Sequence, residues 1–424
     1  MRRKRTSTFL FAGALAALWG SAMAAEPQTA DGLEPYQMMR SLQFVQDTVV
    51  MGDHSAAEMQ RFMLSALDKR LRTINPAAFD DPRNVDAALI YAMSGGNPAT
   101  LEFLVAKDVS GHFDTRVVDA LRKYLNGKGM LASHSFAKMV PEYRNQRIGP
   151  YLALVAGNVA VAKSPKDAMG FYDWARLMAP GTIVEEAALR RSVAIAVEAN
   201  LPDKALSYAR QYARRFVFSP YASQFADLFV RLVVDHFGTI HEEDVDGTLE
   251  VMNDDRSREI YLRIARQATI AGKSDLARFA AARAAERGKD LPARDDSLAR
   301  LFGGVAQLPG GKALDAAKIL ADIPDAALSP EDRALRAAAQ RVAEEVLRPP
   351  VAESFGQDDA DTVKNDISGE TVSAVSGDGK AGTAASASPS GKAGAPKLDP
   401  DFQTYVDRGH STLNAIDDLL KEEK

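Results

Sequence analysis

A short turn between helices recurs along this chain at a nearly constant spacing, and that recurrence restricts the possible folds most. Helical segments of roughly a dozen residues alternate with brief breaks rich in Gly, Asn, Asp and Pro. Pro165 and Pro202 lie 37 residues apart, and a related turn at Gly272 follows at about twice that distance. The breaks that share this character are Gly52-Asp53, Gly96-Asn97-Pro98, 164–168, 200–205 and 272–277.

This spacing favours one architecture. A period in the mid-thirties, with small residues such as Ala168 and Ala205 beside the turn, is typical of tetratricopeptide-like helix pairs. No run of alternating apolar and polar residues indicates a strand. The sequence therefore predicts an all-α fold, in which helix pairs stack into an α-solenoid with an extended concave face. An irregular helical domain with ordinary loops is the alternative, because no single repeat carries the full consensus.

Three helix starts can be predicted from capping chemistry. Ser164 and Ser329 each precede a proline and then an acidic residue, so each hydroxyl can accept from an unpaired N–H of the first turn. The second of these helices should run to about Leu347. Thr182 with Glu185 reads as a capping box, in which the two side chains reciprocally satisfy backbone N–H groups.

The first residues have the layout of a secretory signal. Four basic residues, 2–5, precede a short apolar run, 9–19, and the small-residue pattern Ala22-Met23-Ala24. The apolar run is about half of the roughly 20 residues that a membrane-spanning helix needs. We expect cleavage between Ala24 and Ala25, a periplasmic location and no transmembrane anchor after cleavage. The chain has no cysteine, so it carries no lipid-attachment site and no disulfide.

The composition divides the mature chain into parts. Residues 25–32 form a short leader, and 33–348 form the helical-repeat domain. Residues 349–397 are rich in Ser, Gly, Ala, Asp and Lys, which is typical of a disordered linker. In 398–424 the apolar residues share one helical face, which predicts a short C-terminal amphipathic helix. That helix either folds back onto the solenoid or docks into a groove of a partner.

The net charge of the chain restricts the kinds of molecule that it is expected to bind. The formal net charge is −5, and removal of the four basic residues of the signal makes it −5 − 4 = −9. An acidic protein is a poor match for nucleic acid or an anionic membrane, because both carry negative charge. We therefore expect no nucleic-acid partner.

The candidate catalytic and metal motifs all fail on spacing. Gly272-Lys273-Ser274 imitates the end of a phosphate-binding loop, but Gln267 stands where the loop needs its first glycine. His241 lacks the second histidine of a zinc peptidase pattern, and Val245 occupies that position. The acidic residues around Gly247 do not match a calcium loop, and we expect a hinge between helices there. The sequence supports no catalytic residue, no cofactor and no metal site, so the protein is predicted not to be an enzyme.

One stretch suggests a binding surface. Arg210, Arg214 and Arg215 lie among several aromatic residues, and arginines with aromatics are typical of interface anchors. The aromatic residues concerned are Tyr208, Tyr212, Phe216, Phe218, Tyr221 and Phe225. The three arginines are candidate partner contacts. The alternative is that the aromatics fill the core between helices while the arginines are solvated.

Beyond these patterns, the amino-acid sequence is distinctive in the segments Glu34–Gln37, Arg40–Gln43, Gly52–Ser55, Arg83–Pro98, Arg147–Val155, Ala179–Arg191 and Ser219–Asp227. In these segments the chain resembles the MotC family of periplasmic motility proteins. The resemblance covers most of residues 33–237, and the residues after 348 carry none of it.

The resemblance implies a function that the residues alone do not. It implies a non-enzymatic periplasmic adaptor, needed for flagellar rotation and chemotaxis, that binds and positions the periplasmic part of the stator protein MotB. The resemblance identifies no catalytic or partner-contact residues in this sequence. Two alternatives stay open at this point: a general periplasmic scaffold for envelope or secretion assembly, and a cell-wall enzyme built on a helical solenoid.

Overall fold

The computed structural model describes residues 32–289 and 296–348. The predicted signal peptide with its cleavage site at Ala24 and Ala25, the linker 349–397 and the C-terminal helix 398–424 lie outside these ranges, as does all of the leader except Gly32. Within these ranges, no helix is long and apolar enough to cross a membrane.

The described residues form α-helices joined by short turns, and they contain no β-strand, which confirms the all-α prediction. The helices are α1 Pro35–Val50, α2 Ala56–Thr73, α3 Pro82–Met93, α4 Pro98–Lys107, α5 Thr115–Leu125, α6 Ser133–Glu142, α7 Gly149–Ala160, α8 Pro165–Met178, α9 Ile183–Glu198, α10 Pro202–Phe216, α11 Ala222–Asp235, α12 Glu242–Leu249, α13 Asp254–Ile270, α14 Ser274–Arg287, α15 Ser297–Gln307, α16 Ala313–Ala321 and α17 Pro330–Leu347.

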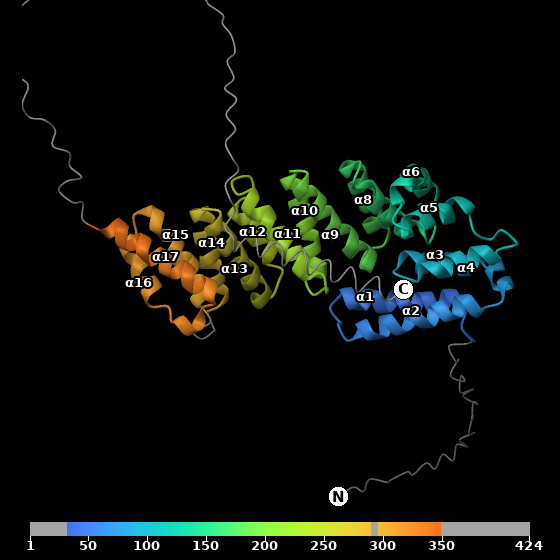
Figure 1. Ribbon diagram of the computed structural model, residues 1–424, viewed down its shortest axis with the longest axis horizontal. Helices are drawn as coiled ribbons and strands as arrows, with labels where there is room; N and C mark the ends of the chain where they lie inside the picture. The colour runs from blue at the N-terminus through green and yellow to red at the C-terminus, as the bar shows by residue number, and fades with distance from the viewer. Residues whose placement is uncertain (1–31, 290–295, 349–424) are drawn as a thin grey trace, which may run out of the picture. The chain divides into compact units, whose positions relative to one another are not determined.

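From α7 onward the helices form stacked pairs, as the solenoid prediction requires. Helix α7 packs on α8, α9 on α10, and α13 on α14, while α9, α11, α13 and α15 also pack on one another in succession (Figure 1). Large aromatic side chains, among them Tyr172, Tyr212 and Phe229, are fully buried between the layers. Each pair thus buries its apolar face against its neighbours, which is how a solenoid acquires a continuous core.

Two of the turns have the same backbone conformation and lie two repeat periods apart in the sequence. Asn200 ends the turn after α9 with φ 57°, and Gly272 occupies the equivalent place after α13 with φ 69°. In both turns the next N–H donates back into the helix, from Leu201 to the Ala196 carbonyl and from Lys273 to the Ala268 carbonyl, at 2.8 Å in each case. The two positions are 272 − 200 = 72 residues apart, or twice 36.

Side chains also bridge from one repeat to the next. Each bridge joins helices that occupy equivalent places in consecutive pairs, so the partners are separated by one period in sequence. The bridges are Arg190 Nη1 to Gln224 Oε1 at 2.9 Å, Arg210 Nη2 to Asp244 Oδ1 at 2.7 Å, Arg263 Nη1 to Asp227 Oδ1 at 2.8 Å and Arg283 Nη2 to Asp246 Oδ2 at 2.6 Å. The degenerate repeat seen in the sequence is therefore a repeat of structure.

The predicted helix starts are all present, but one cap uses other chemistry. Ser164 and Ser329 accept from the N–H three residues on, as expected. The capping box at Thr182 is wrong, because its hydroxyl instead donates to the Ala179 carbonyl at 2.6 Å. The Glu185 carboxylate accepts from the Gly181 N–H at 2.5 Å and is drawn away from the cap by a salt bridge to Arg215.

The first helix pair does not simply stack on the next pair. The α1–α2 hairpin folds back so that α1 packs on α3 and also reaches α9 (Figure 1). Three hydrogen bonds hold it there, and their partners are 108, 136 and 164 residues apart. These bonds are Gln43 Nε2 to Tyr151 Oη at 2.8 Å, the Ile183 N–H to Asp47 Oδ1 at 2.9 Å, and His54 Nε2 with the Phe218 carbonyl at 2.9 Å. A space remains between α1 and the helices beneath it.

Candidate functional site

The predicted arginine surface on α10 is largely occupied by internal ion pairs. Arg210 pairs with Asp244 at 2.7 Å, and Arg215 pairs with Glu185 at 2.5 Å. Arg214 is exposed and has no ion pair with another described residue. The structure therefore leaves Arg214 alone, of the three candidate contacts, free to meet a partner without first breaking a salt bridge.

The aromatic residues of this stretch divide between core and surface. Tyr208, Tyr212, Phe216 and Phe225 are buried, and the rings of Tyr212 and Phe225 stack at 4.3 Å between centroids. Phe218 is exposed, and so is Tyr221, although the guanidinium of Arg190 lies 4.5 Å from the centroid of its ring. Most of these aromatics fill the space between helices, which was the alternative interpretation of this segment.

The segment expected to form a hinge is instead a short helix, α12. Asp244 of α12 accepts from Arg210, and Asp246 accepts from Tyr261 at 2.6 Å and from Arg283. These carboxylates are used to join repeats. The described residues hold no group of three or more His, Asp or Glu side chains placed to bind a metal ion.

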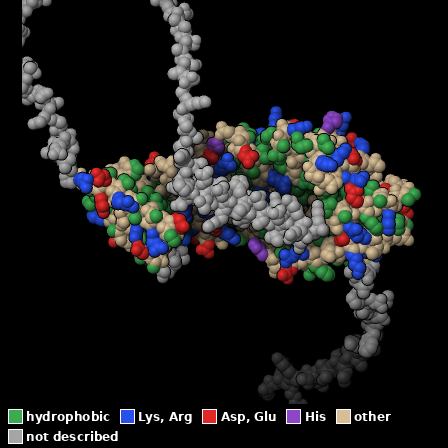
Figure 2. All heavy atoms as spheres, viewed as in Figure 1, with side chains coloured by type: hydrophobic (Ala, Val, Ile, Leu, Met, Phe, Trp, Pro, Cys, Tyr) green, Lys and Arg blue, Asp and Glu red, His purple; other side chains and the backbone are tan. Residues whose placement is uncertain are grey.

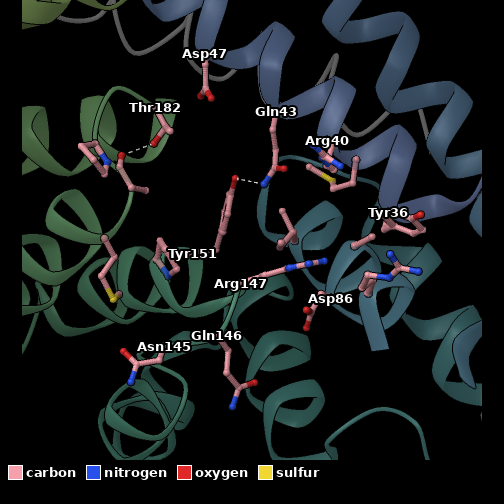
Figure 3. Close-up of a pocket in the computed structure, with 18 residues that line it drawn as sticks. Tyr36, Arg40, Gln43, Asp47, Asp86, Asn145, Gln146, Arg147, Tyr151 and Thr182 are labelled. Atoms are coloured by element: carbon pink, nitrogen blue, oxygen red, sulfur yellow. Dashed lines mark hydrogen bonds between the residues drawn. The ribbon is translucent and has the colours of Figure 1, made fainter. Parts of the chain in front are cut away.

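A concave site lies beneath the folded-back hairpin, and we call it the hairpin cavity. Its volume is about 700 Å³, and its walls come from α1, α3, the segment before α7 and the turn before α9 (Figure 3). Its lining residues are Tyr36, Met39, Arg40, Gln43, Asp47, Arg83, Asp86, Ala87, Ile90, Asn145, Gln146, Arg147, Pro150, Tyr151, Met178, Ala179, Pro180 and Thr182. A volume of roughly 300 to 1,000 Å³ is usual for ligand sites in proteins.

Helix periodicity explains why α1 presents polar groups to the cavity. Tyr36, Arg40, Gln43 and Asp47 follow the spacing of three and four residues that places side chains on one helix face. A separate apolar stripe, with Leu42 at its centre, is buried against the neighbouring helices. The helix therefore has one face for the core and an adjacent face for the cavity.

Three arginines line the cavity, and they differ in how they are held. Arg83 is fixed by Asp81, with its Nη2 2.6 Å from the carboxylate, and its guanidinium lies 4.1 Å from the centroid of the Tyr36 ring. Arg40 and Arg147 are exposed and form no ion pair or hydrogen bond with another described residue. These two guanidinium groups are available to a ligand.

Two carboxylates line the cavity as well. Burial raises the pKa of Asp47, and the hydrogen bond from the Ile183 N–H partly opposes this shift. Burial also raises the pKa of Asp86, against the opposing charge of Arg147. Figure 3 shows Arg40, Arg147 and Asp86 on one side of the Gln43–Tyr151 hydrogen bond, and Asp47 on the other. The cavity thus has a cationic part and a separate hydrogen-bond acceptor.

The tyrosine in the cavity wall is a fixed hydrogen-bonding group. Tyr151 is buried, which raises its pKa to about 12, so the hydroxyl stays protonated at neutral pH. Its oxygen accepts from Gln43, and this bond ties the hairpin to α7 across the cavity. Sequence reasoning missed the site, although the polar stripe on α1 was a visible signal.

The face of the molecule seen in Figure 2 shows less separation of positive from negative charge than the hairpin cavity does. On the face seen in Figure 2, basic and acidic side chains are interspersed over the described helices. Such a face lacks the single-sign field that attracts a charged partner over a long range. Specific recognition on this face would depend on local geometry, as in the hairpin cavity.

The chain is similar along its whole length to proteins of one family. The family model described as "Chemotaxis protein MotC" matches residues 1–424. A curated relative, "Chemotaxis protein MotC" of Rhizobium meliloti (strain 1021), is 50% identical over 431 residues, covering 99% of this chain and 99% of the relative. No solved structure is significantly similar to the chain.

Proposed function

The chain belongs to the MotC family of chemotaxis proteins, and from this premise we propose that it is a non-enzymatic periplasmic adaptor that binds the flagellar stator. The partner is the periplasmic part of the stator protein MotB, which the adaptor holds or positions so that the flagellum rotates. Family membership supports the role in motility and chemotaxis. The secretory layout of residues 1–24 supports the periplasmic location.

The observation that carries a binding role is the hairpin cavity, in which Arg40 and Arg147 have no ion-pair partner among the described residues. Five of the seven segments that resemble the family line this cavity, although they are far apart in sequence. They come from α1, α3, α7 and the start of α9 with their adjoining turns. A helical array that presents a concave site of mixed polarity is suited to recognise another protein.

The direct test is association of the purified mature chain with the purified periplasmic part of MotB. We expect the two proteins to co-elute in size-exclusion chromatography, and a strain lacking this protein to assemble flagella but swim poorly. A complemented strain is the control. Normal swimming of the deletion strain together with no association would contradict the proposal. Envelope defects with normal motor torque would favour the general scaffold instead.

The proposed periplasmic location can be tested by altering the predicted signal-peptide cleavage site. Replacing Ala24 with Arg removes the small side chain that the signal peptidase pocket requires, so the precursor should accumulate. Fractionation followed by mass measurement should find the unaltered protein in the periplasm, beginning at Ala25. Recovery of full-length unaltered protein from the cytoplasm would contradict export.

A further inference from the structure

We propose that the hairpin cavity binds an extended peptide segment of a partner protein, with an Asp or Glu carboxylate of that segment held between Arg40 and Arg147. The proposal rests on the proposed function only in taking the ligand to be part of a protein. It names the chemistry of the recognised segment and two of the residues that read it.

The two arginines form a site for an anion that no described residue of the chain fills. Arg40 comes from α1 and Arg147 from the connection before α7, 147 − 40 = 107 residues apart in sequence, and both line the same cavity. Their common position depends on the folded-back hairpin. Arginine presents a planar set of donors that matches a carboxylate in a bidentate arrangement.

The neighbouring acid does not take this role. Asp86 lies close enough to Arg147 for their charges to interact, yet the two side chains form no salt bridge. The remaining cation, Arg83, is already neutralised by Asp81. Of the three arginines that line the cavity, Arg40 and Arg147 therefore hold no salt bridge to another described residue, and Asp86 offsets only part of their positive charge.

The rest of the lining favours a peptide over a simple carboxylic acid. Gln43, Asn145 and Gln146 carry amide groups, which both donate and accept hydrogen bonds as a peptide backbone does. Asp47, on the far side of the Gln43–Tyr151 bond, is an acceptor for a backbone or side-chain N–H. A cavity of about 700 Å³ exceeds the needs of a single anion and accommodates several linked groups.

An exposed phenylalanine at the rim of the hairpin cavity adds a requirement for an apolar side chain in the bound segment. Phe44 lies one helical turn after Arg40, and 72% of it is exposed. It lines a second hollow of about 460 Å³, which shares Arg40 with the hairpin cavity. An exposed phenylalanine next to an unpaired arginine has the composition of an interface anchor. The bound segment should therefore carry an apolar side chain close to its acidic one.

The test uses a library of linear peptides displayed on phage and selected against the full mature chain. Selected sequences are then made with a fluorescein label and titrated by fluorescence anisotropy. We expect binders that carry an Asp or Glu beside an apolar residue. Arg40→Ala or Arg147→Ala should weaken binding by about tenfold or more, the loss of a charge-assisted hydrogen bond. Phe44→Ala should weaken it less, and Arg147→Glu should change the selection toward basic peptides.

The controls separate this site from the general surface. Arg341→Ala removes an exposed arginine from α17, away from the lining residues, and should leave the peptide affinity unchanged. Exchanging the peptide's acidic residue for its amide should cause about the same loss as the Arg40→Ala, Arg147→Ala double variant, with little further loss when the amide peptide is combined with that variant. No selected binder, binders indifferent to Arg40 and Arg147, or equally tight binding of free glutamate would each overturn the proposal.

The two proposals can fail separately. If MotB associates equally well with the Arg40→Ala, Arg147→Ala double variant, the proposed function stands and the hairpin cavity is not its site. If MotB does not associate but acidic peptides bind through both arginines, the peptide site stands and the proposed function fails.

Discussion

The lack of a side chain at Gly157 of α7 permits the close packing of α7 on α8. The Tyr172 ring of α8 lies where a Cβ would be, and an added Cβ at position 157 would come within 2.6 Å of Tyr172 Cδ1. The ring cannot easily move, because its hydroxyl donates to Asn158 at 2.9 Å and its surroundings are fully buried. Close packing of α7 and α8 depends on this contact.

Gly157→Ala should therefore destabilise the protein by about 1 to 3 kcal/mol, the usual cost of overpacking a core. Gly170→Ala is the matched control, since Gly170 is an exposed helical glycine with nothing within 4 Å of its added Cβ. Alanine there should stabilise by roughly 0.5 to 1 kcal/mol, because it favours the helix. Urea unfolding of both variants measures the difference. Equal effects at the two glycines would contradict the packing argument.

Asp114 makes the stability depend on pH in the acid range. Hydrogen bonds from Arg116, and also from Tyr143, lower the pKa of Asp114 from 3.8 to about 2 against the opposing effect of burial. The unfolded state binds the proton first as the pH falls, so the contribution is complete above a pH of about 4 and is lost toward about 2.

Asp114→Asn should thus reduce the fall of the melting temperature between pH values of about 4 and 2, while it keeps the helix-capping oxygen. Tyr143→Phe removes one hydrogen bond to the carboxylate and raises the folded-state pKa of Asp114, so the fall should be smaller and should end at a higher pH, while its onset stays where the unfolded state begins to bind the proton. Melting curves across this range test both changes. Identical pH profiles for the three proteins would show that Asp114 does not contribute.

At the scale of the elements, the turns after α9 and α13 require a left-handed residue. Asn200 meets this need in one turn and Gly272 in the other. Left-handed backbone costs other residues about 1 to 2 kcal/mol, whereas glycine adopts it freely and asparagine tolerates it. Pro202 then begins α10, where its missing N–H costs nothing.

Alanine at either position should lower the free energy of unfolding by about 1 kcal/mol. Asn200→Gly and Gly272→Asn are the matched controls and should change it by much less. No side-chain contact confounds the comparison at Gly272, where an added Cβ meets nothing within 4 Å. Chemical unfolding provides the measurement, and full tolerance of alanine at both positions would disprove the requirement.

At the scale of the described repeat domain, the first half of α2 is attached less firmly than the helices of the stacked pairs. The first half of α2 has no buried residue, and only Leu67 and Leu71 of that helix are buried. Helix α13, in contrast, has several buried residues and packs on α11, α14 and α15. Regions with few buried contacts open at a lower free energy.

Backbone amides of the first half of α2 should therefore exchange with deuterium faster than those of α13 and α14. Asp47→Ala removes the acceptor for the Ile183 N–H and should speed exchange in the hairpin while α13 and α14 keep their protection. Mass spectrometry of peptic fragments resolves the two regions. Uniform acceleration along the chain would show that the hairpin opens only with the whole domain.

Local chemistry made the helices and their period predictable. The caps at Ser164 and Ser329 and the turns around Pro202 and Gly272 depend on residues within a few positions of one another, so the pattern alone was sufficient. The box at Thr182 failed because the Glu185 carboxylate accepts from the Gly181 N–H and pairs with Arg215, a residue distant in sequence. The hinge around Gly247 failed for the same reason, since Asp244 and Asp246 bind arginines one period away.

What the amino-acid sequence determined by itself was the helical class, the repeat of about 36 residues and the family, since these depend on local patterning and on the wording of contiguous segments. Only the tertiary structure decided that the first hairpin folds back, which brings Arg40 and Arg147 to one cavity. Only the tertiary structure, likewise, placed Arg210 and Arg215 in salt bridges with Asp244 and Glu185. The physical reason is the range of the interactions. Contacts that span more than a hundred residues, such as Gln43 with Tyr151, leave no periodic trace in the chain.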